Sequence, residues 1–201
     1  MCGRFTAAFS DAELKDICKS VGQNSTADEM TLMKKEGEIF PSDVFPIMTG
    51  AETFRAMSWG FSVEGKKQLI INARSETILE RPMFQKPALR NRCLILCNGF
   101  FEWNKRKQKY LYQLPGGGLM YLAGIWRMER GSNTPKFTIL TRDAVGDQLD
   151  VHDRIPVIVP RELIYTWLAE SGKIMEIIQQ AVTELRIVNL SAPEPNLFDM
   201  V

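Results

Sequence analysis

The chain has 201 residues, with 25 basic and 24 acidic side chains, and its hydrophobic fraction of 45% is ordinary for a globular domain. This composition excludes disordered, collagenous and coiled-coil proteins. The longest apolar runs, such as residues 93–97, are far shorter than the roughly 20 residues of a membrane-spanning helix, and no apolar signal region opens the chain. Four cysteines are too few for a disulfide scaffold. We therefore expect a cytoplasmic monomer with reduced thiols that contacts no membrane.

The first predicted elements are a strand over residues 4–9 and a helix over residues 11–21. Ser10 and Glu13 begin this helix with the spacing of a capping box, in which each side chain accepts a hydrogen bond from a backbone amide at the helix start. Residues 22–38 are polar, and we predict a loop there. Further strands are expected in a segment bracketed by Pro41 and Pro46 and near residues 53–58, 69–73, 93–101, 109–114, 119–126 and 137–141.

The three glycines at 116–118 predict a hairpin turn between two of these strands. Pro160 is expected to open a helix that stops near Gly172. A second short helix and a last strand over residues 184–190 complete the chain. Many short strands with few helices predict one compact α+β domain over residues 1–201, with a curved or barrel-like, mainly antiparallel sheet and peripheral helices.

Basic side chains are concentrated in residues 81–109, which contain eight lysines and arginines and a single acid, Glu102. The same segment contains Phe100, Phe101 and Trp103. Cations interleaved with aromatic rings are typical of a face that binds single-stranded nucleic acid. A solvated hairpin with a charged tip would have the same composition, so charge alone does not decide between the two.

Cys2 is the first candidate for chemistry. Removal of Met1 would give this residue a free α-amine beside its thiol. An α-amine has a pKa of about 8, so roughly a tenth of it is neutral and nucleophilic at pH 7. Such an aminothiol reacts with an aldehyde twice, because the amine forms a Schiff base and the thiol then closes a thiazolidine ring. A buried and inert thiol is the alternative.

Four other polar residues are candidates. His152, the only histidine, opens a polar cluster just before an apolar run, where side chains commonly line sites. Glu102 stands among aromatic residues, and burial there would raise its pKa toward neutrality. Asn72 and Arg74 share one face of a strand, and the Arg74 guanidinium suits a phosphate. Each of these residues could equally be structural or a solvated surface residue.

Metal and nucleotide cofactors are not expected. Cys93 and Cys97 share a strand face, but the four ligands of a zinc site with zinc-finger spacing are absent from the sequence. The sequence also lacks a phosphate-binding loop and a dinucleotide-binding fingerprint. We therefore predict a protein without metal, nucleotide or other organic cofactor.

Four sequence blocks together resemble the SOS-response-associated peptidase (SRAP) family. They are residues 1–5 (MCGRF), 72–77 (NARSET), 99–103 (GFFEW) and 152–156 (HDRIP), in the order of the family and across most of the chain. The resemblance implies a sensor of abasic sites in single-stranded DNA. Members of the family crosslink to the aldehyde of the ring-opened deoxyribose through the N-terminal cysteine, giving a thiazolidine.

The resemblance also implies a role for each site residue. Cys2 is the nucleophile, Asn72 orients the abasic sugar, and Glu102 and His152 transfer protons. Contacts to the DNA backbone and bases are implied for Arg4, Arg74, Arg154 and Thr141, which face phosphates, and for Trp59, Phe40 and Pro41, which stack on or wedge between bases.

Some positions depart from the family pattern. Phe101 and Ile155 are mild apolar exchanges, and residues 61–64 (FSVE) replace the usual proline-containing continuation. Glu38 stands near a position that is often asparagine, and a carboxylate is unfavourable beside a DNA channel.

Two other functions stay open at this stage. Cys2 could act with His152 and Glu102 as a cysteine peptidase, or the chain could be a DNA-binding module without chemistry. A chain that keeps Met1 has an amide nitrogen at residue 2, so we expect it not to crosslink. The resemblance implies that Met1 is removed by the protein itself.

Overall fold

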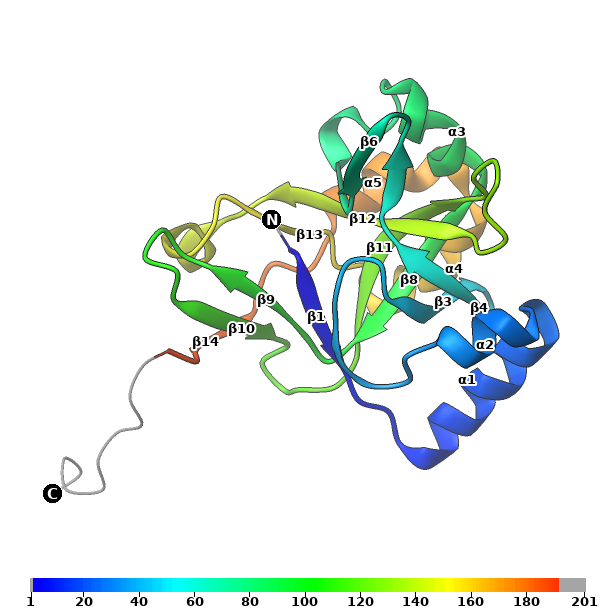
Figure 1. Ribbon diagram of the computed structural model, residues 1–201. Coiled ribbons are helices and arrows are strands. Elements are labelled where there is room, and N and C mark those ends of the chain that lie inside the picture. The colour runs from blue at the N-terminus through cyan, green and yellow to red at the C-terminus, as the bar shows by residue number, and fades with distance from the viewer. Residues whose placement is uncertain (1, 192–201) are drawn as a thin grey trace, which may run out of the picture.

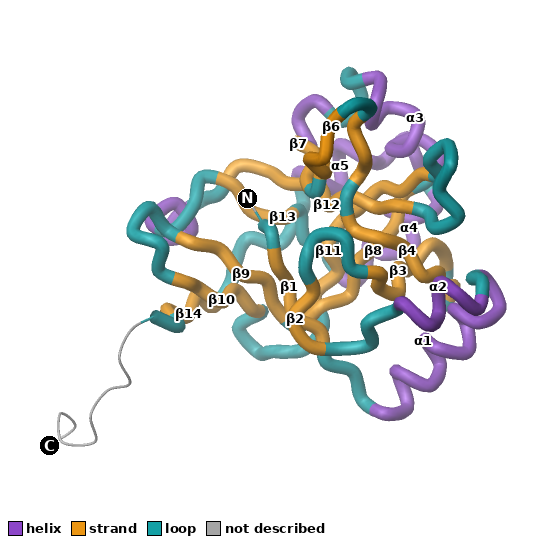
Figure 2. Tube along the Cα trace, in the orientation of Figure 1, coloured by secondary structure: helices purple, strands orange, loops and turns teal. Residues whose placement is uncertain are grey.

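The computed structural model describes residues 2–191, so the prediction about Met1 lies outside the described residues. Two sheets form most of the fold, as Figures 1 and 2 show. The smaller sheet has five strands in the order β14-β10-β9-β1-β2, all antiparallel. Its strands are β1 (Arg4–Ala7), β2 (Gly37–Ile39), β9 (Gly99–Trp103), β10 (Lys109–Gln113) and β14 (Arg186–Asn189).

The larger sheet closes on itself. Its path β11-β8-β3-β4-β12 returns to β11 because β12 also pairs with β11, and β13 and β7 pair with β12 outside this ring. Only the β12–β4 and β12–β7 pairings among the described strands are parallel. The strands are β3 (Val44–Gly50), β4 (Thr53–Trp59), β7 (Asn72–Arg74), β8 (Arg92–Cys97), β11 (Met120–Arg127), β12 (Lys136–Asp143) and β13 (Arg154–Pro156). The expected barrel-like, mainly antiparallel α+β fold is thus confirmed.

Two hydrophobic clusters divide the core. The buried helical side chains belong to the first cluster, on the outer side of the ring. These helices are α1 (Asp11–Asn24), α2 (Ala27–Leu32), α3 (Pro82–Arg90), α4 (Ile164–Ala169) and α5 (Ile174–Gln179). The second cluster takes residues from strands of both sheets, among them Phe5, Phe45 and Trp59. In Figure 1 the helices accordingly lie around the larger sheet, away from β9, β10 and β14.

The capping box at the start of α1 is confirmed, since Ser10 and Glu13 exchange the expected hydrogen bonds. The prediction of a loop over residues 22–38 was wrong. α1 continues to Asn24, and Thr26 with Glu29 repeats the capping-box spacing to begin α2. The polarity of this segment reflects short, half-exposed elements rather than a loop.

One prediction about a strand and one about a turn were also wrong. The predicted strand over residues 93–101 is two strands, because the chain leaves the ring at Asn98 and continues in the other sheet. Asn98 makes this change possible by bonding β1, with its amide donating to the carbonyl of Thr6. The glycines at 116–118 do not close a hairpin, since β10 and β11 belong to different sheets. They form the connection between the sheets instead.

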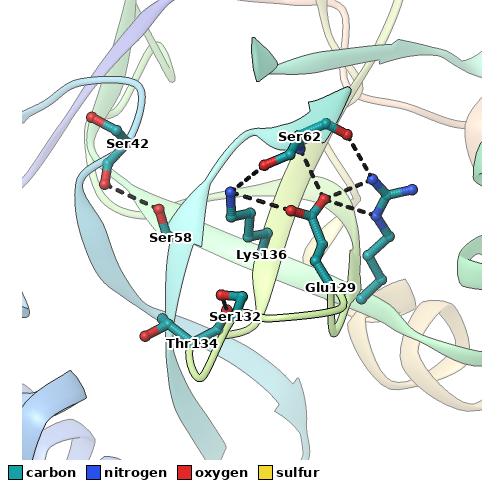
Figure 3. A network of polar contacts seen from close by, with 8 residues as sticks. Ser42, Ser58, Ser62, Glu129, Ser132, Thr134 and Lys136 are labelled. Atoms are coloured by element: carbon teal, nitrogen blue, oxygen red, sulfur yellow. Dashed lines mark hydrogen bonds and ion pairs between the residues drawn. The ribbon is translucent and has the colours of Figure 1, made fainter. Parts of the chain in front are cut away.

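A separate hairpin of β5 (Phe61–Val63) and β6 (Lys66–Ile70) stands between β4 and β7. Gly60 begins it with a positive φ of 112°, and a Cβ there would lie 2.9 Å from the Cβ of Leu69, so only glycine fits. The polar network in Figure 3 fastens the hairpin to β11 and β12: the Ser62 amide and the Arg127 guanidinium donate to Glu129, which also pairs with Lys136. This anchor fixes the segment that leads into β7.

Candidate active site

Cys2 lies at the entry to β1, the strand between β2 and β9. Its side chain is fully buried, and its Sγ lies 3.6 Å from the carbonyl oxygen of Arg4. Burial raises the pKa of this thiol well above its usual value, and the negative charge of nearby Glu102 raises it further. The sulfur is therefore a neutral thiol at pH 7, and it needs a proton acceptor before it can attack.

Asn72 fixes the backbone of Cys2. Its Nδ2 donates a hydrogen bond of 2.8 Å to the Cys2 carbonyl oxygen. The side chain comes from β7, where Ala73 is buried and Arg74 is exposed on the same face as Asn72. The Oδ1 of Asn72 is buried and has no hydrogen-bond partner among the described residues. The amide therefore holds Cys2 in place and keeps an acceptor available at the site.

Glu102 is placed by β9, the neighbour of β1. Its side chain is 1% exposed, and burial raises its pKa from 4.5 to about 7. A carboxyl group with this pKa is present in both protonation states near neutrality. It can thus accept a proton in one step and return it in the next.

His152 comes from the segment just before β13. Its Nδ1 accepts a hydrogen bond of 3.0 Å from the Arg154 amide, which leaves the proton of the neutral ring on Nε2. The same Nδ1 lies 2.7 Å from Asp153, but that carboxylate is 81% exposed, so the backbone contact decides the tautomer. Burial lowers the pKa of His152 and favours the neutral ring.

A pocket of about 760 Å³ lies beside His152. His152 and Asp153 line one part of it, and Trp103, Lys105 and Arg106 of the β9–β10 hairpin line another. The basic and aromatic segment seen in the sequence thus shares a pocket with His152, one of the candidate site residues. Whether the hairpin binds nucleic acid stays a prediction.

Arg4 extends from β1 onto the outer face of the five-stranded sheet. Its guanidinium carbon lies 4.3 Å from the ring centre of Phe40 and 5.1 Å from that of Trp103. Phe40 is 36% exposed and Pro41 is half-buried. Arg4, Phe40 and Pro41 are therefore accessible to a ligand near Cys2, as is Arg74.

Three other predicted DNA contacts lie in the interior. Trp59 is fully buried, its Nε1 donates to the Ile71 carbonyl, and its ring stacks on Phe137. The full burial of Trp59 does not support the expected base-stacking role, because no face of the ring is accessible in this structure. Trp59 is a core residue that joins the two sheets.

Thr141 and Arg154 are bound to each other. Arg154 is 7% exposed, and its guanidinium donates two hydrogen bonds of 2.9 Å to Glu76 and one of 2.6 Å to Asp143. It also donates to the carbonyl oxygen of Thr141, which is fully buried. These contacts do not support the predicted phosphate contacts, since Nη1 and Nη2 already donate within the protein and Nε is buried.

Sequence reasoning missed the two acids that hold Arg154. Glu76 belongs to the NARSET block, two residues after Arg74. The block therefore contained the residue, but nothing in the sequence indicated that it pairs with Arg154. Asp143 ends β12 opposite Arg154, a pairing that only the strand register reveals. Within residues 2–191 no group of three or more potential metal ligands was found, and none of the helices there is long and apolar enough to cross a membrane.

Comparisons with known proteins identify the family. The model of the SOS response associated peptidase (SRAP) family matches residues 1–192. Abasic site processing protein YoqW of Bacillus subtilis is 31% identical over 189 residues, covering 84% of this chain and 80% of that protein. For YoaM of the same organism, also called an abasic site processing protein, the identity is 35% over 185 residues, with 84% and 79% covered. The crystal structure of a phage-related protein from Bordetella bronchiseptica, 25% identical, has a TM-score of 0.73 over 95% of both chains. This chain therefore belongs to the SRAP family.

Proposed function

We propose that this protein processes abasic sites in single-stranded DNA and captures the lesion covalently through Cys2. The arrangement of Cys2, Asn72 and Glu102 is the observation that supports this most strongly. A fully buried thiol held beside a carboxyl group with a pKa of about 7 suits a reaction that moves several protons. The names of the similar proteins point to the same substrate.

The proposed reaction begins after Met1 has been removed, which the protein could catalyse itself. The Cys2 amine attacks the aldehyde carbon of the ring-opened deoxyribose, and loss of water gives a Schiff base. The thiol then adds to the same carbon and transfers its proton to the imine nitrogen through Glu102. One aldehyde and one aminothiol thus give one thiazolidine and one water, without oxidation or reduction.

The other side chains would assist this sequence. Asn72 holds the Cys2 carbonyl and offers its Oδ1 to the sugar. His152, neutral with its proton on Nε2, would exchange a proton with the sugar oxygen during ring opening. Arg4 and Arg74 would bind the flanking phosphates, with Phe40 and Pro41 against the neighbouring bases. We further propose that the protein acts as a cytoplasmic monomer and needs no cofactor.

A denaturing gel tests this proposal. The purified protein, shown by intact mass to lack Met1, is mixed with an oligonucleotide that contains one abasic site. A shifted band is expected from the wild type and from Cys18→Ala, which removes a half-buried thiol of α1, but not from Cys2→Ala. Cys2→Ala and Cys2→Ser both keep the α-amine and lose the thiol, so we expect an adduct from either variant only when borohydride reduces the Schiff base. An equal band from Cys2→Ala without a reductant would overturn the proposal.

A peptidase that uses Cys2 with Glu102 and His152 is supported less well. A cysteine nucleophile reacts as the thiolate and is usually activated by a lowered pKa. Burial and Glu102 raise the pKa of Cys2 instead. Turnover of peptides other than the Met1–Cys2 bond would favour this alternative over the crosslink.

A further inference from the structure

One carboxylate bridges two cations on the outer face of the five-stranded sheet. The Glu38 carboxylate accepts a hydrogen bond of 3.0 Å from Arg4 and, through its other oxygen, one of 2.7 Å from the Lys109 ammonium. We call these three side chains the Glu38 cluster. They come from β2, β1 and β10, so the cluster extends across the sheet over β9. The hydrogen bond from Lys109 is the main cause that holds the pKa of Glu38 below its usual value.

Aromatic rings lie under both cations. Arg4 is within 5.1 Å of the ring centres of Phe40 and Trp103, and the Lys109 nitrogen is 3.9 Å from the ring centre of Phe101. Cations stacked on aromatic rings are the elements from which proteins build surfaces for single-stranded nucleic acid. In this protein an internal anion occupies that surface.

The cluster is open to solvent and close to Cys2. The exposed fractions of the side chains are 28% for Arg4, 36% for Glu38 and 25% for Lys109, so an external anion can reach them. Arg4 follows Cys2 by two residues. A backbone phosphate of a strand held at Cys2 therefore meets a place where two cations are already arranged around an oxyanion.

We propose that Lys109 is a second phosphate-binding cation beside Arg4, and that Glu38 competes with the DNA backbone for both of them. This inference rests on the proposed binding of single-stranded DNA. In the free protein the Glu38 carboxylate neutralises the two cations. In the complex a phosphate takes its place, and the displaced carboxylate stays close enough to repel the strand. Glu38 thereby lowers the affinity for every single strand, with or without a lesion.

Charge removal at Glu38 tests the competition. The affinities of Glu38→Gln and of the matched control Glu36→Gln are measured by fluorescence anisotropy with a lesion-free oligodeoxythymidine. Glu36 is exposed and two residues away, so it controls for the change in net charge. We expect Glu38→Gln to bind about fivefold more tightly than Glu36→Gln. Its dependence on salt should also steepen by roughly 0.7 in the log–log slope, because one more cationic charge is then free to neutralise a phosphate.

A thermodynamic cycle with Lys109→Ala identifies the cation. The gain from Glu38→Gln should fall to less than half in the Lys109→Ala background, because one of the two released cations is then missing. Equal affinity of Glu38→Gln and Glu36→Gln would overturn the inference, as would a gain that is unchanged without Lys109. Unfolding midpoints of all variants confirm that the sheet is intact.

These results are distinguishable from failure of the proposed function. If the protein crosslinks through Cys2 but Glu38→Gln does not change its affinity for DNA, the proposed function stands and this inference is overturned. If Glu38→Gln tightens binding but no crosslink forms, the DNA-binding surface stands and the proposed covalent chemistry is overturned.

Discussion

Glu102 is a buried carboxyl group whose pKa of about 7 differs from the 4.5 of an exposed glutamate because burial disfavours its charge. Between these two pH values the folded protein holds a proton that the unfolded chain has lost. Stability therefore falls as the pH rises through this window. The shift corresponds to about 3 kcal/mol at full deprotonation.

Glu102→Gln removes this titration. Its free energy of unfolding relative to the wild type should increase by about 2 kcal/mol between pH 5 and pH 8, measured by urea unfolding. The exposed control Glu162→Gln should show no comparable change. Parallel pH profiles for wild type and Glu102→Gln would show that Glu102 does not titrate in this window. In the proposed reaction, the same variant should bind DNA normally but form the adduct more slowly.

Arg74 and Arg154 show that residue type alone does not determine whether an arginine is exposed or buried in an ion pair. Both stand in family blocks, and the resemblance gave both the same role at phosphates. Arg74 is exposed on β7, whereas Arg154 is 7% exposed and held by Glu76 and Asp143. Burial and pairing depend on strand register, so the sequence could not distinguish the two arginines.

Arg74→Ala should weaken binding to intact and abasic single strands alike, because a phosphate contact carries no information about the lesion. The slope of log affinity against log salt should become shallower by roughly 0.7. Filter binding at several salt concentrations measures both quantities. Lost crosslinking with unchanged binding would instead place Arg74 in the chemistry.

At the scale of elements, the β5–β6 hairpin depends on one acid. Glu129 is 11% exposed in its side chain and pairs with Arg127 and Lys136 while accepting from the Ser62 amide (Figure 3). Its removal leaves two cations and one amide without this partner. The hairpin leads directly into β7, so the positions of Asn72 and Arg74 depend on this anchor.

Glu129→Ala should lower the opening free energy of the hairpin amides by about 2 kcal/mol. Hydrogen exchange over residues 61–70 measures this change. Glu64→Ala, at the exposed turn of the same hairpin, should leave the exchange rates nearly unchanged. Equal rates in the two variants would mean that the strand pairing alone holds the hairpin.

The elements that the sequence predicted well are those with a local signal. The helix at residues 11–24 has a capping box and an apolar stripe, and its start was predicted correctly. The break at Asn98 and the crossing at residues 116–118 have no such signal, because they follow from which sheet each strand joins. At the site, Cys2, Asn72 and Glu102 are brought together as expected, but the interior position of Trp59 follows from packing.

At the scale of the whole molecule, the two sheets share one core. Phe5 of the five-stranded sheet is fully buried, and its ring centre lies 5.2 Å from those of Phe45 and of Trp59 in the ring. The second hydrophobic cluster contains residues from both sheets throughout. Neither sheet could unfold alone without exposing this cluster to water, so we predict that the protein unfolds as one cooperative unit.

Phe5→Ala tests this coupling, because it removes a ring from one sheet that packs on the other. It should lower the free energy of unfolding by about 3–5 kcal/mol, whereas Phe40→Ala at an exposed ring should cost much less. The protection factors of the most protected amides should fall by the same factor in β9 and in β8. Calorimetric and van't Hoff enthalpies should agree for both variants. A loss of protection confined to β9, or two separate transitions, would mean that the sheets are independent domains and that the hydrogen bond between Asn72 and Cys2 crosses a mobile boundary.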